Sequence, residues 1–181
     1  MTGRATDPVS GTGSDTASGA DPDRASAAGR DGAPAAAGWP WSLRVPTRWG
    51  DEDRYGHVNN ALAYPVFENA IMGYLQSADL DPNAGEVRCY TVENGCTYLA
   101  PVHHPDTLVA GLGVSRLGRT SVRYEIAVSS GRDARPRWRG FVVDVFVDAA
   151  TERPVPVPAP YREALAPLLL DSAPPSPAHR R

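Results

Sequence analysis

The chain changes its hydrophobic period once, and this change constrains the fold more than any other feature of the sequence. Between Asn60 and Ala78, apolar residues recur at helical spacing: Leu62, Val66, Phe67, Ala70, Ile71, Tyr74, Leu75 and Ala78. After Gly85 the pattern becomes strand-like in four runs, Arg88–Leu99, Thr107–Leu117, Thr120–Ser130 and Arg137–Val147. An earlier alternating run, Trp41–Thr47, predicts a first strand, and its Pro46 favours a sheet edge or a strand end.

Short turns between the later runs determine how the strands pair. Leu117-Gly118-Arg119 and Gly131-Arg132-Asp133 are typical of hairpin turns, which force neighbouring strands to be antiparallel. The run that ends at Val147 has apolar residues on both faces, which indicates a central strand. The sequence therefore predicts an α+β fold in which a five-stranded antiparallel sheet wraps around one long central helix. A short helix from about Pro160 to Leu170 closes it.

The long helix has a recognisable start. Asn59 and Asn60 are both candidates for its N-cap. Pro65 fits only the first turn, so the regular helix is expected to begin nearer Tyr64. Its apolar stripe is wide, which predicts burial on most sides.

Composition divides the chain into three parts. Residues 1–38 are almost entirely small, polar or Pro residues, with Met1 and Val9 the only large aliphatic ones, so we expect a disordered tail. Residues 39–171 form the expected domain, and hydrophobic residues are 41% of the chain, enough for a core. Residues 172–181 are expected to be a second disordered tail.

Charge and cysteine content exclude several classes. A net charge of −3 gives no basic face for nucleic acid. No signal-peptide core or membrane span is evident, so a cytoplasmic protein that does not bind membranes is expected. Cys89 and Cys96 lie seven apart in one strand run, which predicts opposite faces and no disulfide. Nothing around either one argues for a nucleophile.

Most of the candidate catalytic side chains lie in one segment, Asp53-Arg54-Tyr55-Gly56-His57-Val58-Asn59-Asn60. A polar loop that ends at a helix start places a carboxylate beside unpaired backbone N–H groups, which stabilise developing negative charge. A base beside an oxyanion donor is what hydrolysis of an activated acyl group needs. Asp53 is the candidate base or nucleophile, although an Asp that caps its own turn is the simpler reading.

These residues, with two further patterns, resemble a known family. The segment is similar to a D-x-x-x-H-V-N-N signature, and Tyr64 to Phe67 followed by Glu68 is similar to an aromatic-then-acid pattern. Tyr98-Leu99-Ala100-Pro101 and then Pro105-Asp106 match a third pattern. Over roughly Leu43 to Val147, the chain resembles the 4-hydroxybenzoyl-CoA thioesterase-like family of hotdog-fold acyl-CoA thioesterases.

The resemblance implies a hotdog fold and hydrolysis of an acyl-CoA to free acid and coenzyme A, with no cofactor. It implies a homodimer, often doubled to a homotetramer, with active sites at the subunit interface. Asp53 aligns with the catalytic carboxylate, and the N–H that polarises the thioester carbonyl aligns near Asn60. Ala63 and Asn69 depart from the family pattern and Pro65 is unusual, so the acyl group stays open.

More than one role stays open for most of the other site residues. His57 is expected to orient Asp53, bind the thioester or bond the loop, and Asn59 to cap the helix beside the substrate. Tyr64 and Glu68 are candidates for substrate binding, and the Glu68 side chain faces either inward or the solvent.

Arg116, Arg119 and Arg123 surround one hairpin. They are either solvated or bind the phosphates of coenzyme A. Asp51 and Glu52 are expected to face solvent or local arginines. No metal is expected, because His103 and His104 lie in a separate turn.

Three alternatives stay open at the level of function. The substrate is an acyl-CoA or an acyl carrier protein thioester. The protein could instead be a non-catalytic hotdog module that binds acyl thioesters. A hotdog dehydratase fits less well, because the His-containing signature of those enzymes sits differently from His57-Val58-Asn59-Asn60.

Overall fold

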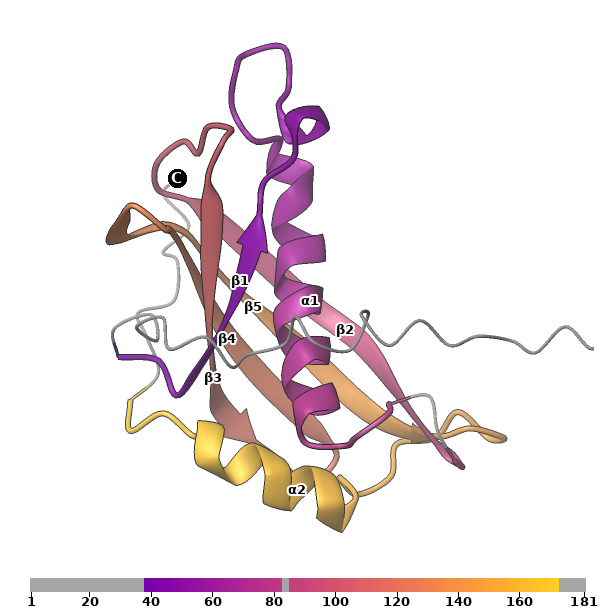
Figure 1. The fold of residues 1–181 in the computed structure, drawn as a ribbon. Helices are drawn as coiled ribbons and strands as arrows, with labels where there is room; N and C mark the ends of the chain where they lie inside the picture. The colour runs from indigo at the N-terminus through magenta and orange to yellow at the C-terminus, as the bar shows by residue number, and fades with distance from the viewer. Residues whose placement is uncertain (1–37, 83–84, 173–181) are drawn as a thin grey trace, which may run out of the picture.

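The computed structural model describes residues 38–82 and 85–172, so most of both predicted tails lies outside the described residues. Figure 1 shows one long helix, α1, lying across one face of a five-stranded sheet. The strands are β1 (Trp41–Pro46), β2 (Val87–Tyr98), β3 (Thr107–Leu117), β4 (Ser121–Ser130) and β5 (Asp133–Asp148). They lie in the order β1-β3-β4-β5-β2, and every neighbouring pair is antiparallel. The predicted α+β class and antiparallel sheet are confirmed, with Pro46 at the end of an edge strand.

The helix start follows from two local residues. The Oδ1 atom of Asn59 accepts the N–H of Ala61 at 2.9 Å, so Asn59 is the cap of the short 3-10 turn η3 (Asn60–Leu62). Helix α1 (Ala63–Ser77) continues from it. Pro65 is the third residue of α1, where an N–H has no intrahelical partner, so the missing donor costs nothing.

Helix α1 packs through a single stripe. Its buried residues are Ala63, Val66, Phe67, Ala70, Ile71 and Leu75, and they pack over β1, β3 and β5. Below them lie large buried side chains of the sheet, among them Leu112, Tyr124, Trp138 and Phe146. Tyr64, Glu68 and Asn69 beside this stripe are exposed, so the expected burial of α1 on most sides is wrong for the single protomer.

Strand β5 is an interior strand, as its apolar pattern predicted, because it pairs with both β4 and β2. Val142 and Phe146 face α1 and are buried. Phe141, Val143 and Val145 on the far face are only half-buried, because no helix covers that face of the strand.

The two cysteines face the same side of the sheet, which corrects the expectation of opposite faces. A bulge between Thr91 and Glu93 resets the alternation of β2, so Cys89 lies opposite Phe146 and Cys96 opposite Gly140. Both cysteines are free thiols, well apart along the strand.

A second helix closes the end of the sheet far from the start of α1 (Figure 1). Helix α2 (Ala159–Leu165) and the 3-10 turn η4 (Ala166–Leu168) cover the range where the sequence predicts one helix. Tyr161 packs edge-on against Phe146, with ring centroids 5.1 Å apart. The hydroxyl of Tyr74 on α1 donates to the carbonyl of Ala164, which ties α2 to the end of α1.

Candidate active site

The segment between β1 and α1 folds into a short two-stranded ladder. The N–H of Asn59 donates to the carbonyl of Asp51 at 2.8 Å, and the N–H of Asp53 donates to the carbonyl of His57 at 2.9 Å. Gly56 closes the turn with φ at +73°, a backbone conformation that side-chain-bearing residues rarely adopt. The ladder therefore fixes the turn Asp53–His57 relative to the helix start at Asn59.

The two carboxylate oxygens of Asp53 differ in their contacts. Its Oδ1 atom accepts the N–H of Tyr55 at 2.8 Å and the N–H of His57 at 3.5 Å, so the side chain does cap its own turn. Its Oδ2 atom makes no hydrogen bond within residues 38–82 and 85–172. One oxygen thus holds the carboxylate in place, and the other is available to a water molecule or a substrate.

Asn60 presents an unpaired backbone donor at the helix start. Its carbonyl accepts the hydroxyl of Tyr98 at 2.7 Å, which ties this residue to the end of β2. No hydrogen bond among the described residues engages the Asn60 N–H. The positive end of the α1 dipole adds to this donor, so the position suits a developing oxyanion.

The turn between β2 and β3 supports the site, which the sequence reading missed. His103 and His104 were placed in a separate turn, but the His103 and His57 rings lie edge to face, with centroids 5.0 Å apart. The N–H of His104 donates to the Oε1 atom of Glu52 at 2.9 Å, so the half-buried Glu52 binds a backbone N–H where a local arginine or solvent was expected. Asp51 does pair with Arg48, at 3.0 Å, as expected. No local pattern links residues 47 positions apart, so only the fold could bring His103 to Gly56.

Tyr64 and Glu68 lie on the exposed side of α1. The Tyr64 ring packs edge-on to Phe67, with centroids 6.1 Å apart. Partial desolvation, together with the nearby Asp144, raises the pKa of Glu68 above its usual range. Asp144 is 5% exposed on β5, where it accepts the hydroxyl of Thr91 at 2.7 Å. Glu68 is therefore exposed but close enough to Asp144 for the two carboxyl groups to interact.

The hairpin arginines lie far from Asp53 in the same protomer. Arg116 and Arg119 flank the β3–β4 turn, whose carbonyls at Gly118 and Arg119 bond to the α2 region. The 11 residues of β3 separate this turn from the Asp53 end of the sheet, more than roughly 30 Å. The Nε atom of Arg123 lies 2.8 Å from the Oε1 atom of Glu125, and its guanidinium carbon lies 3.7 Å from the centre of the Phe141 ring. Its charge is therefore paired within the protomer.

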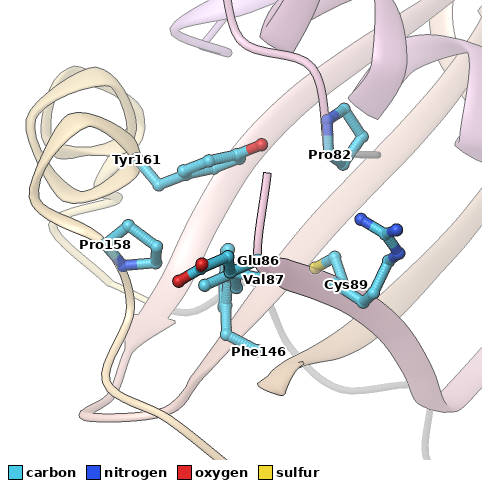
Figure 2. Close-up of a pocket in the computed structure, with 8 residues that line it drawn as sticks. Pro82, Glu86, Val87, Cys89, Phe146, Pro158 and Tyr161 are labelled. Carbon is cyan, nitrogen blue, oxygen red and sulfur yellow. The ribbon is translucent and has the colours of Figure 1, made fainter. Parts of the chain in front are cut away.

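A cavity of about 200 Å³ lies at that same far end. Figure 2 shows Tyr161 and Pro158 on one side of it, Cys89 and Pro82 on the other, and Phe146 and Val87 between them. Burial, followed by the nearby Asp144, raises the pKa of the Cys89 thiol to about 12. Cys89 is thus protonated near neutrality, and its thiol is a poor nucleophile.

A five-stranded antiparallel sheet with one long helix lying across its face is the hotdog fold of thioesterases. The chain belongs to the thioesterase-like superfamily, whose family model matches residues 47–165. The protein is therefore a thioester hydrolase.

Solved structures agree with this assignment. The PA5185 protein of Pseudomonas aeruginosa strain PAO1 is 39% identical, with 75% of this chain and 96% of that chain covered and a TM-score of 0.71. A thioesterase from Thermus thermophilus, complexed with coenzyme A and Zn, is 30% identical, covering 73% and 96% of the two chains with a TM-score of 0.62. A 1,4-dihydroxy-2-naphthoyl-CoA thioesterase from Synechocystis, 19% identical over 68% and 93% with a TM-score of 0.65, shares the fold.

Three negative findings complete the comparison. A search of curated proteins finds no match. Within the part of the chain that the structure describes, no three His, Cys, Asp or Glu side chains are grouped to hold a metal ion. No described helix is long and apolar enough to cross a membrane.

Proposed function

We propose that this protein hydrolyses acyl-CoA thioesters to a free acid and coenzyme A, with Asp53 as the catalytic carboxylate. The observation that carries the proposal is the unpaired Oδ2 atom of Asp53 on a turn fixed against a helix start whose Asn60 N–H is also unpaired. Coenzyme A bound to the Thermus thermophilus thioesterase supports this carrier.

The reaction needs one base and one oxyanion donor. Asp53 takes a proton from water, and the resulting hydroxide attacks the thioester carbonyl carbon. Alternatively, the carboxylate attacks directly and forms a mixed anhydride, which water then hydrolyses. In both routes the Asn60 N–H and the α1 dipole stabilise the oxyanion, the C–S bond breaks, and the thiolate of coenzyme A leaves and takes up a proton.

The other predicted residues have supporting roles in this proposal. His57 lies beside the reacting carboxylate at the end of the turn. Asn59 caps the helix start and so orients the Asn60 N–H. Tyr64 and Glu68 project from the exposed side of α1 and line the path of the acyl group.

The active site is completed by a second copy of the chain. Strand β2 is an edge strand of the sheet formed by the described residues, and Tyr90 and Val92 on it are 45% and 62% exposed. Two β2 strands that pair antiparallel bring opposite ends of the two sheets together. Arg116 and Arg119 of one protomer then approach the Asp53 turn of the other and can grip the phosphates of coenzyme A. Two such dimers can associate further into a homotetramer.

A carrier protein in place of coenzyme A is the second candidate substrate, because both present the same phosphopantetheine thioester. We place the reaction in the cytoplasm. Release of free thiol from a panel of acyl-CoAs and acyl carrier proteins separates the two carriers.

Substitution of Asp53 tests the proposal. Asp53→Asn keeps the acceptor for the Tyr55 N–H and removes the charge, so we expect turnover to fall by about 10²-fold or more while acyl-CoA binding persists. His57→Ala should cost less, since an orienting group contributes less than the base. If Asp53→Asn turned over every acyl-CoA in the panel at the wild-type rate, the assignment of Asp53 would be wrong.

A further inference from the structure

Three consecutive residues of the β2–β3 turn form hydrogen bonds with the turn that carries Asp53 or with its flanks. The carbonyl of Val102 accepts the N–H of Val58 at 2.8 Å, and the N–H of His104 donates to Glu52 at 2.9 Å. Between them, the Nδ1 atom of His103 lies 2.7 Å from the carbonyl oxygen of Gly56. Val102 and His104 secure the base of the ladder, whereas His103 reaches the tip.

The bond from His103 defines its tautomer. A carbonyl oxygen can only accept, so the Nδ1 atom of His103 must carry a proton and donate it. The ring is therefore not a base at this nitrogen, and its edge-to-face contact with His57 fixes the plane of the imidazole.

The peptide that His103 binds is also the peptide that binds Asp53. The Gly56 carbonyl and the His57 N–H belong to one planar trans peptide and point in opposite directions. The His57 N–H donates to the Oδ1 atom of Asp53 at 3.5 Å, the longer of the two bonds on that oxygen. The order of contacts is thus His103 Nδ1–H, Gly56 C=O, His57 N–H and Asp53 Oδ1.

We infer that His103 is a positioning residue for Asp53 and acts through the Gly56–His57 peptide. This inference rests on the proposed role of Asp53. Rotation of this peptide costs least where it follows a glycine, and Gly56 has a positive φ of +73°. The His103 bond prevents that rotation and polarises the peptide, which strengthens the N–H donor on the other side. The carboxylate is then held with its Oδ2 atom toward the substrate.

Three substitutions at His103 test the inference. His103→Ala removes the donor. His103→Asn places an amide N–H where Nδ1 stands, and His103→Gln places it about one bond further out. We expect His103→Ala and His103→Gln to lower kcat about fivefold to tenfold, as for one lost orienting hydrogen bond, with KM and the melting temperature nearly unchanged. His103→Asn should recover most of the lost kcat.

A double variant shows whether His103 acts through Asp53. In the Asp53→Asn background, His103→Ala should lower the residual rate by less than about twofold, because the group that it positions is already disabled. A wild-type kcat for His103→Ala, equal losses for the Ala and Asn variants, or fully additive losses in the double variant would each overturn the inference. Full activity of Asp53→Asn alone would instead reject the proposed catalytic role of Asp53.

Discussion

At the residue scale, two carboxylates of this protein lie in opposite environments. Asp53 sits on a half-exposed turn, and backbone N–H groups hold one of its oxygens. Asp144 is buried under α1, where its partners are the hydroxyl of Thr91 and the thiol of Cys89. The first environment leaves a charged oxygen available for chemistry, whereas the second disfavours the charge.

This difference predicts a pH-dependent gain in stability from Asp144→Asn. Burial raises the pKa of Asp144 above that of the unfolded chain, so the folded protein binds this proton more tightly. Between the two pKa values, stability therefore falls as pH rises. Asn keeps an acceptor for Thr91 and removes this loss, so the variant should melt a few degrees higher at pH 7. Below about pH 3.9, where an unfolded Asp is also protonated, the advantage should vanish. Thermal unfolding from about pH 3.5 to 7 measures it; an advantage that does not change with pH would contradict the cause.

At the scale of elements, the distance between α1 and the sheet is set by one glycine. A Cβ atom at Gly140 would lie 2.2 Å from the Phe67 ring and 2.5 Å from the Gly95 carbonyl. Phe67 is fully buried and the carbonyl belongs to the β2–β5 ladder, so neither can move aside easily. The helix can approach β5 this closely only because the position has no side chain.

We therefore expect Gly140→Ala to destabilise the fold by about 1–3 kcal/mol, the usual cost of overpacking a core. Urea unfolding measures the effect. Gly50→Ala is the matched control, because nothing lies within 4 Å of a Cβ there and its φ is not positive. An unchanged midpoint for Gly140→Ala would show that α1 can shift away from the sheet without loss.

The sequence predicts these elements well where a local pattern determines them. The Gly118 and Gly131 turns and the Asn59 cap are all local, and all are confirmed. The bulge at Thr91 depends on the register between β2 and β5, which no local pattern encodes. The spacing of the two cysteines in the sequence therefore could not predict which face of the sheet Cys89 lies on. The contact of His103 with Gly56 was hidden for the same reason, since it forms only when two turns meet at one end of the sheet.

At the scale of the whole molecule, the two edge strands of the described sheet differ. Strand β1 is short, and α1 packs against it, whereas the 12-residue β2 has a run of exposed residues from Tyr90 to Asn94. A long exposed edge strand invites pairing with another copy. In the proposed reaction such pairing would also have a function, because Arg116 and Arg119 are far from Asp53 in one protomer and a second protomer would bring them close.

A charge on this edge should therefore remove both assembly and activity. Val92→Lys places an ammonium group in the middle of the exposed stretch of β2, where a paired copy would have to bury it. We expect light scattering to give the mass of a dimer or tetramer for the wild type and of a monomer for Val92→Lys, with an unchanged circular dichroism spectrum. The rate of acyl-CoA hydrolysis should fall along with the measured mass, because the monomer keeps Asp53 but lacks the arginines of the second copy.

Gln76→Lys, an exposed change near the end of α1, is the matched control and should alter neither the mass nor the rate. A monomeric Val92→Lys variant with full activity would show that one protomer is sufficient, and a wild type that is monomeric at micromolar concentration would exclude the pairing altogether.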